Sequence, residues 1–212
     1  MAEHSLTGVG GIVLCGGRSS RMGRPKHLLP FGNRTMLQVV VDTLRSVVEP
    51  VVVVHAADQP ICPLPPDVLT AQDEQDDFGP LAGIAAGLTA LAAHCRAAYV
   101  TSCDVPLLKP EVVEFLIAAA AERDAAVVRD GKYVHVLAGV YAAALLPRVC
   151  RLLEERRLRP LFLLDECDAR YVDVAELRSV DPELSSFRNV NTPEDYADVS
   201  RIAGVENEDG AR

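Results

Sequence analysis

The chain has 212 residues, 49% of them hydrophobic and 24% charged, a composition typical of a globular domain with one substantial core. Its 30 Asp and Glu outnumber its 21 Lys and Arg, and the formal net charge of −9 argues against a general nucleic-acid binder, which needs clustered cations. Since there is no signal-like N-terminus and no apolar run of about 18 residues, we expect a cytoplasmic protein without a membrane span.

The first expected strand, Val9–Cys15, runs into a glycine loop that is rich in cations. Between positions 4 and 41 the chain has no carboxylate but five cations, which are Arg18, Arg21, Arg24, Lys26 and Arg34. Gly16 and Gly17 let backbone N–H groups approach an anion without a Cβ in the way. The spacing differs from both the P-loop and G-x-G-x-x-G. It favours a phosphate-binding loop of another kind over the alternative, a glycine turn with solvated cations.

The next stretch alternates helix and strand as far as Asp73. Thr35 is expected to cap a helix, and the apolar face of that helix carries Leu37, Val40, Val41, Leu44 and Val48. Pro50–His55 is a valine-rich run typical of a strand that is covered on both faces. Val68–Ala71 is expected to be a further strand, which places Asp73 just beyond its end.

A helix is expected over Gly79–His94, entered through Pro80. It carries small residues at Gly79, Ala82, Gly83, Ala86 and Gly87. These residues allow a close approach to a neighbour, which is either the backbone of the sheet or a flat ligand. A glycine-rich helix start also offers unpaired N–H groups to a ligand.

Asp104 follows directly on the expected strand Ala97–Cys103. Pro106 then halts further sheet pairing, because proline has no backbone N–H. A carboxylate in this place can hold Mg²⁺ while phosphate oxygens and water complete the shell. The alternative is an Asp that caps a turn, but its position at the same sheet edge as the cationic loop favours the metal.

The C-terminal half continues the same alternation. We expect helices over Glu111–Arg123, Ala143–Glu155 and Leu161–Glu166, and strands over Ala125–Arg129 and Tyr133–Tyr141 around the turn Asp130-Gly131. The last helix begins at Thr192, with Thr192 at the N-cap, Pro193 at the first helical position and Asp195 two residues further on.

This alternation predicts an α/β three-layer sandwich, in which a mostly parallel sheet is covered by helices on both faces and binds ligands at the carboxyl ends of its strands. No linker or repeat divides the chain, so we expect one domain over 1–205 and a disordered polar tail over 206–212. The six cysteines contain no C-x-x-C pair and no zinc-like cluster with histidine, and we expect thiols.

Taken together, these residues resemble the molybdenum cofactor guanylyltransferase family, within the wider nucleotidyltransferase superfamily. The resemblance runs from Gly11 to Tyr196. The segments that carry it are Leu14-Cys15-Gly16-Gly17, Arg21-Met22-Gly23 with Lys26, Asp73, Gly79-Pro80-Leu81-Ala82-Gly83, Cys103-Asp104-Val105-Pro106 and Phe187-Arg188-Asn189-Val190-Asn191-Thr192-Pro193-Glu194. It implies a Rossmann-like sheet of the nucleotide-diphospho-sugar transferase type.

The resemblance implies transfer of GMP from GTP to molybdopterin that carries molybdenum, with release of pyrophosphate. The nucleotide would be lined by Leu14, Cys15, Gly16, Gly17 and Asp73, its triphosphate held by Arg21 and Lys26, and Mg²⁺ bound by Asp104. GTP and molybdopterin are then the small-molecule substrates, without nucleic acid or membrane. Transient contact with molybdoenzymes or with proteins that insert the cofactor also follows from the resemblance.

Arg21, Lys26 and Asp104 would act by positioning the substrates and neutralising charge, because the attacking phosphate is already an anion. One alternative is a related nucleotidyltransferase that uses CTP with molybdopterin, or another nucleotide with a sugar phosphate. A second alternative is a nucleotide-binding protein without catalysis. The sequence leaves open the role of His55 and the residues that face the acceptor.

Overall fold

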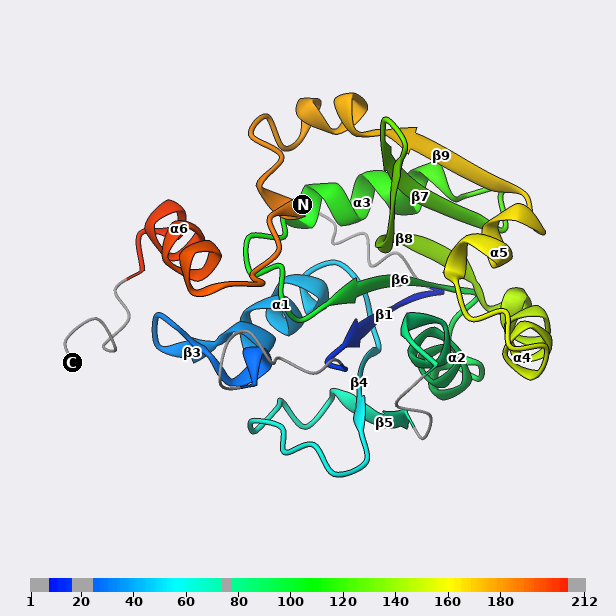
Figure 1. Cartoon of the computed structure of the whole chain (residues 1–212), viewed down its shortest axis with the longest axis horizontal. Coiled ribbons are helices and arrows are strands. Elements are labelled where there is room, and N and C mark those ends of the chain that lie inside the picture. Colours follow the sequence, from blue (N-terminus) through cyan, green and yellow to red (C-terminus); the bar gives the residue numbers. More distant parts are fainter. Residues whose placement is uncertain (1–7, 17–24, 74–77, 206–212) are drawn as a thin grey trace.

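A seven-stranded sheet forms the centre of the protein, in the strand order β5-β4-β1-β6-β8-β7-β9 (Figure 1). The structure is a computed structural model that describes residues 8–16, 25–73 and 78–205. The strands are β1 Val9–Leu14, β4 Val51–Ala56, β5 Leu69–Asp73, β6 Ala97–Ser102, β7 Ala125–Asp130, β8 Tyr133–Ala142 and β9 Ala169–Asp173. A separate two-stranded hairpin joins β2 Pro30–Phe31 to β3 Arg34–Thr35.

All neighbouring strands of the sheet are parallel except where β8 is involved, since β8 runs antiparallel to both β6 and β7. The predicted mostly parallel sheet is therefore confirmed. Because β1, β4, β5 and β6 run the same way, their carboxyl ends meet at one edge. Asp73 and the residues that follow Leu14 and Ser102 are thereby brought to the same edge.

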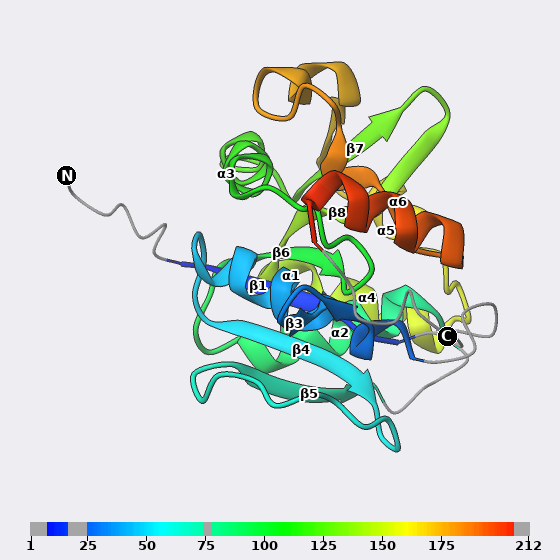
Figure 2. The same ribbon diagram turned by 90° about the vertical axis from the view of Figure 1, so that its left-hand side faces the viewer.

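Helices cover both faces of this sheet, as expected for three layers (Figures 1 and 2). Helices α1 (Met36–Arg45) and α3 (Pro110–Ala119) lie on one face. The other face is covered by α2 (Pro80–Leu91), α4 (Leu146–Glu154) and α5 (Pro160–Asp165). Helix α6 (Pro193–Ala203) packs instead through Val199 against a small cluster that includes Phe31 of the hairpin.

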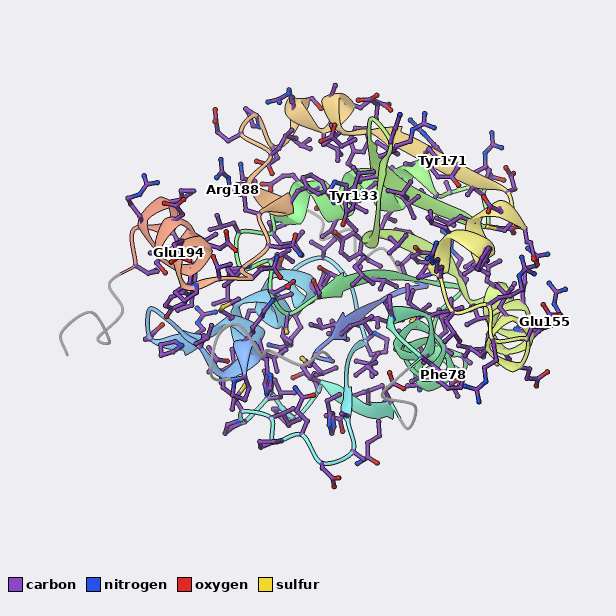
Figure 3. All side chains as sticks on the ribbon, in the orientation of Figure 1. Phe78, Tyr133, Glu155, Tyr171, Arg188 and Glu194 are labelled. Atoms are coloured by element: carbon purple, nitrogen blue, oxygen red, sulfur yellow. The ribbon has the colours of Figure 1, made fainter. Side chains whose placement is uncertain are left out.

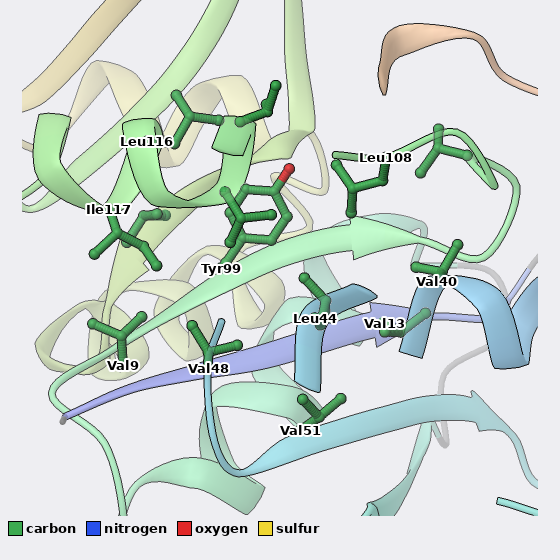
Figure 4. Packing of buried hydrophobic residues seen from close by; sticks show 14 of the residues in the cluster. Val9, Val13, Val40, Leu44, Val48, Val51, Tyr99, Leu108, Leu116 and Ile117 are labelled. Atoms are coloured by element: carbon green, nitrogen blue, oxygen red, sulfur yellow. The ribbon is translucent and has the colours of Figure 1, made fainter. Parts of the chain in front are cut away.

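Alternating side chains of the central strands build the two main cores. On β1, Val9 and Val13 join the core with α1 and α3, whereas Ile12 and Leu14 join the core with α2. All four are at most 7% exposed. Figure 4 shows the first core, with Val13 of β1 on the same side of the sheet as Leu44 of α1. A strand buried on both faces cannot be polar on either, which explains the continuous apolar runs in the sequence.

The predicted helix starts are confirmed at both capping boxes. Thr35 and Gln38 cap α1 reciprocally, and Thr192 and Asp195 do the same for α6. The predicted ends are less accurate, because α3 stops at Ala119 rather than Arg123.

Several short elements were not predicted. They are β9, the hairpin β2-β3, and the 3-10 helices η1 Lys26–Leu28, η3 Val174–Ser179 and η4 Ser185–Phe187, whereas η2 Ala143–Leu145 opens the predicted helix over Ala143–Glu155. Each has two to six residues, too few to show a helical or strand period. The predicted tail over 206–212 lies outside the described residues. Within the described ranges, no helix combines the length and the apolarity needed to cross a bilayer.

The antiparallel strand β8 carries a wide bulge beside the carboxyl end of β6. Gly139 pairs with Val127, but the next pair on β7 joins Val128 to His135, so residues 136–138 arch out of the ladder. The Tyr141 hydroxyl donates to the carbonyl of Val136 at 2.7 Å and braces this arch. Bulges of this kind bend a strand and redirect side chains next to functional sites.

Candidate active site

Lys26 and Asp104 meet at the carboxyl edge of the sheet although they are 78 positions apart in the sequence. Lys26 opens η1 directly after Pro25, and Asp104 lies two residues beyond the end of β6. The Lys26 ammonium lies 3.4 Å from Asp104 Oδ2, and both side chains are about one-sixth exposed (18% and 16%). The structure thus brings together two of the three side chains that were predicted to act in catalysis. The third, Arg21, lies outside the described residues, as does Gly17.

Two asparagines from the segment before α6 complete this cluster. Lys26 donates to Asn191 Oδ1 at 2.7 Å, and Asn189 Nδ2 donates to Asp104 Oδ1 at 3.3 Å. The backbone N–H of Val190 also donates to the carbonyl of Asp104 at 2.8 Å. The segment that precedes the last helix therefore fixes both the lysine and the carboxylate.

The cap of α6 holds this asparagine segment in place. Asp195 accepts hydrogen bonds from the backbone N–H groups of Asn191 and Thr192, each at 2.9 Å. The bond from Asn191 is the main reason why the pKa of Asp195 lies below its usual value. From the sequence, this segment predicted a helix start and contributed to the family resemblance, but Asn189 and Asn191 were not predicted as site residues. The paired asparagines were the available signal that the same motif also reaches the site.

A cavity of about 280 Å³ opens beside this cluster, between the strand ends and the start of α2. Leu14, Gly16 and Asp73, three of the predicted nucleotide contacts, line it together with Ser102. The cavity is also lined by Val54, His55, Ala56, Gly79, Pro80, Gly83 and Leu137. Its apolar walls with a few convergent polar groups are typical of a small-molecule site.

Cys15 does not line this cavity, in contrast to its neighbours. Its thiol is buried, and a hydrogen bond with Cys103 together with burial holds the pKa of Cys15 well above its usual value. Its backbone N–H donates to Val54 O at 2.8 Å, and its carbonyl accepts from Gln59 Nε2 at 2.9 Å. The described residues therefore already use both backbone groups of Cys15.

The small residues of α2 serve the two purposes that the sequence left open. A Cβ on Gly87 would come within 2.6 Å of Ile12, and one on Gly83 within 3.1 Å of Leu14, so both glycines allow close packing on β1. Gly79, at the N-cap with φ +67°, would meet nothing within 4 Å and instead lines the cavity. Gly87 therefore serves helix packing, Gly79 faces the cavity, and Gly83 packs on Leu14 and also lines the cavity.

A second cavity, of about 130 Å³, adjoins the first at Ser102 and Leu137, which line both. Its walls come from β6, the bulge of β8 and the segment that includes Phe187 and Asn189. Figure 3 labels Tyr133, which begins β8, and Arg188, which lies in the segment between Phe187 and Asn189. Because Asp104 bonds to both Ser102 and Asn189, it stands where the two cavities meet.

The donor set around Asp104 fits a hard divalent cation. The carboxylate of Asp104 and the neighbouring hydroxyl of Ser102 offer oxygen ligands, whereas Asn189 turns its Nδ2 toward the carboxylate. Within the part of the chain that the structure describes, no three His, Cys, Asp or Glu residues gather as a metal site. A metal held by one carboxylate, with phosphate oxygens and water, is the manner in which Mg²⁺ binds in nucleotide sites.

Comparison with known proteins gives a consistent result. Residues 11–170 match the family model described as the MobA-like NTP transferase domain. A protein of Methanosarcina mazei, named as a probable molybdenum cofactor guanylyltransferase, is 36% identical over 89% of this chain and 88% of its own length. A Mycobacterium avium protein of the same name is 38% identical over 87% of this chain and 91% of its own length.

Among solved structures, that of molybdopterin-guanine dinucleotide biosynthesis protein A from Archaeoglobus fulgidus is similar with a TM-score of 0.76 and 25% identity. The match covers 92% of this chain and 98% of that one. A cytidylyltransferase from Thermus thermophilus shares the fold with a TM-score of 0.69, at 17% identity. The Rossmann-like nucleotidyltransferase fold is therefore confirmed.

Proposed function

Because the chain belongs to the family of MobA-like NTP transferase domains, we propose that it is a molybdenum cofactor guanylyltransferase. It transfers GMP from GTP to the terminal phosphate of molybdopterin that carries molybdenum. The bond formed is a phosphoanhydride between that phosphate and the α-phosphorus of GTP. The bond broken joins the α- and β-phosphates, and pyrophosphate leaves.

One observation carries this proposal, namely that Lys26 and Asp104 meet at the carboxyl edge of the sheet, where Asp104 bonds to Ser102, a residue that lines both cavities. Transfer between two anions needs both substrates in one place, with cations at their junction. The larger cavity, beside the glycine loop and α2, suits the nucleotide. The smaller cavity, beside the β8 bulge, suits the acceptor, whose phosphate then faces the α-phosphorus next to Asp104.

The residues of this chain act by positioning and by charge, since the attacking phosphate needs no protein base. Lys26 holds the triphosphate and offsets negative charge as the α–β bond breaks. Asn191 fixes the lysine through its 2.7 Å hydrogen bond. Arg21 and the backbone of Gly16 and Gly17 are proposed to contact the phosphates as well, following the family resemblance.

Asp104 would hold Mg²⁺, which when bound neutralises phosphate charge and polarises the phosphoryl oxygens. Ser102 and Asn189 orient this carboxylate through hydrogen bonds to Oδ1. Lys26 approaches the other oxygen, Oδ2. Three neighbours from different parts of the chain, Lys26, Ser102 and Asn189, therefore fix the orientation of the Asp104 carboxylate.

Two acceptors in the larger cavity favour guanine. His55 lines this cavity, and its Nδ1 lies 2.8 Å from the carbonyl of Ala56, so Nδ1 is the donor in this hydrogen bond and Nε2 is left for a ligand. The carboxylate of Asp73 lines the same cavity. Guanine presents two adjacent donors on its base-pairing edge, whereas cytosine presents one.

The deciding experiment is incubation of the protein with GTP, Mg²⁺ and molybdenum-loaded molybdopterin, followed by mass analysis of the product. We expect the guanine dinucleotide cofactor and pyrophosphate, and Asp104→Ala should abolish both. If the wild-type protein gives no product, the proposed reaction is wrong.

We also propose that residues 1–205 act as one domain in the cytoplasm.

A nucleotide panel separates the related alternatives. GTP, CTP, UTP and ATP are each titrated with Mg²⁺, and the shift in melting temperature is measured. GTP should stabilise most. A larger shift with CTP would favour a cytidylyltransferase, and stabilisation by GTP without turnover would favour a nucleotide-binding protein without catalysis.

A further inference from the structure

The second cavity contains a buried hydroxyl that no described residue satisfies. Tyr99 lies on β6, lines this cavity and is 0% exposed. Its hydroxyl has no hydrogen-bond partner among the residues that the structure describes. Figure 4 shows the ring standing away from β6, with the oxygen at its outer end. An unpaired buried hydroxyl destabilises a fold, and a native chain that keeps one commonly uses it for a ligand.

The opening of this cavity is aromatic. The rings of Tyr133 and His135 meet edge to face with centroids 4.6 Å apart, and the His135 ring lies 5.2 Å from that of Phe187. All three residues line the cavity. Burial lowers the pKa of His135, against a smaller opposing effect of Asp130, so the ring favours its neutral form. Flat apolar surfaces of this kind stack on planar rings.

The arch of β8 gives the cavity its space. Val136, Leu137 and Ala138 leave the ladder opposite the end of β6 and line the cavity, whereas regular pairing would have closed it. Thr101, which is 1% exposed, adds a second hydroxyl-bearing side chain two residues beyond Tyr99. The cavity thus combines an aromatic entrance with hydroxyl groups in its interior.

We propose that this cavity receives the planar heterocyclic head of the acceptor, and that the Tyr99 hydroxyl is a specificity-determining contact to its polar edge. The inference rests on the proposed function for the identity of the acceptor, whose head is a pterin. Tyr99 does not touch the reacting phosphates, which lie beside Asp104. It selects the acceptor because a ring without a hydrogen-bonding edge would leave the hydroxyl buried and unpaired.

The test is Tyr99→Phe, which removes one oxygen atom and keeps the ring. We expect the KM for the molybdopterin acceptor to rise about five- to tenfold, the loss of one neutral hydrogen bond, while the KM for GTP stays unchanged. Because the variant also removes an unsatisfied group, the melting temperature of the free protein should rise by about 2–4 °C. If the hydroxyl had a purely structural role, Tyr99→Phe would instead lower the melting temperature.

Tyr171→Phe is the matched control, since Tyr171 packs with the core on the opposite face of the sheet. It should leave both KM values unchanged. An unchanged acceptor KM in Tyr99→Phe would overturn the proposal, and so would an equal rise in the control.

A binding measurement separates this inference from the proposed reaction. Free pterin is titrated into wild-type protein, Tyr99→Phe and Tyr171→Phe without nucleotide or metal, and protein fluorescence is followed. Pterin should bind the wild type and the control, and bind Tyr99→Phe about five- to tenfold more weakly. If pterin binds in this way but no GMP transfer is detected, the proposed reaction is refuted while the proposed pterin site is supported. No pterin binding to wild-type protein would refute the site.

Discussion

In the proposed mechanism, Lys26 is positioned for an anion before the anion binds. Its ammonium is held between Asn191, at 2.7 Å, and Asp104, at 3.4 Å. These contacts hold a flexible four-carbon side chain beside Asp104, at the carboxyl edge of the sheet. Such preorganised charge contributes to catalysis because little reorganisation is needed when charge develops.

Lys26→Ala should lower kcat about 100-fold or more, the scale for losing one preorganised charge contact. Asn191→Ala should lower kcat less, because the lysine remains but is no longer oriented. Steady-state GMP transfer measures both. Arg201→Ala is the control, since Arg201 is 74% exposed on α6 and pairs with Asp198. Normal turnover in both Lys26→Ala and Asp104→Ala would refute the mechanism.

At this scale the sequence allowed prediction of Lys26 and Asp104, because each follows a recognisable strand or glycine loop. It did not predict Asn189 and Asn191 as site residues. Their contacts join positions up to 165 apart in the chain, and no local period records such a distance. Cys15 was expected at the nucleotide, but only its neighbours line the cavity, because alternation turns its side chain toward the core.

The bulge of β8 depends on one glycine. A Cβ on Gly139 would come within 2.6 Å of both the Ala126 carbonyl and Val127 Cγ1. The backbone of β7 cannot withdraw, since it is also paired with β9 on its other side. The glycine therefore permits the tight register on one side of the arch.

Gly139→Ala should lower the free energy of unfolding by about 1–3 kcal/mol, the usual cost of overpacking. Urea denaturation followed by circular dichroism measures this difference. Gly16→Ala provides the matched control for stability, because a Cβ there meets nothing within 4 Å. Equal stability of the two variants would show that β8 can shift to accommodate the methyl group.

Asp181 anchors the segment that leads to the site. Its buried carboxylate accepts from Lys109 Nζ at 2.8 Å, from Ser185 Oγ at 3.0 Å and from the Ser186 N–H at 2.8 Å. Burial by itself raises the pKa of Asp181, but these bonds outweigh it and lower the pKa from 3.8 to about 2. The ionised carboxylate is therefore more stable in the folded protein than in the unfolded chain.

This lowered pKa predicts an acid-dependent contribution to stability. It is fully present above about pH 4 and is lost as the pH falls toward 2, since protonation then removes the acceptor. The difference in free energy of unfolding between wild type and Asp181→Asn should be about 2 kcal/mol at pH 7 and shrink toward zero at pH 2. Asp198→Asn, an exposed control on α6, should show a small difference throughout. A difference for Asp181→Asn that does not change with pH would contradict the assignment.

Long elements were predictable because their apolar periods extend over several turns or a whole strand. The short strand β9 was not, although Tyr171 and Val172 offered a weak strand signal. Its place at the sheet edge is decided by pairing with β7, 39 or more positions earlier. The two strands predicted around the turn Asp130-Gly131 do pair with each other as β7 and β8, but the antiparallel pairing of β8 with β6 was not predicted.

On the scale of the molecule, charge is distributed unevenly. The net charge is −9, yet the stretch from 4 to 41 contains five cations and no carboxylate. Two of these five cations lie in the part of the chain that the structure describes. Lys26 lies beside Asp104 in the candidate site, and Arg34 pairs with Asp42. A net acidic protein whose cations are concentrated in one segment should favour small anions over extended polyanions.

The protein should therefore elute from heparin below about 0.15 M salt, the physiological ionic strength. Its kcat/KM for GTP should fall as the salt concentration rises, because salt screens the attraction between the anionic GTP and the cationic segment. Chromatography and steady-state kinetics over the same salt series measure the two effects. Strong retention on heparin at physiological salt would contradict this view of the surface.

The asparagine segment has a consequence for synthesis on the ribosome. The nascent chain emerges from its N-terminus at about 5–20 residues per second, so Lys26 and Asp104 exist well before Asn189 and Asn191. The last strand of the sheet ends at Asp173, ahead of both asparagines. A translating chain can thus complete its sheet while its chemistry is still unfinished. In the proposed mechanism, the asparagines that position Lys26 and Asp104 are the last part of the site to be made, and a chain that ends before Asn189 should have a lower kcat.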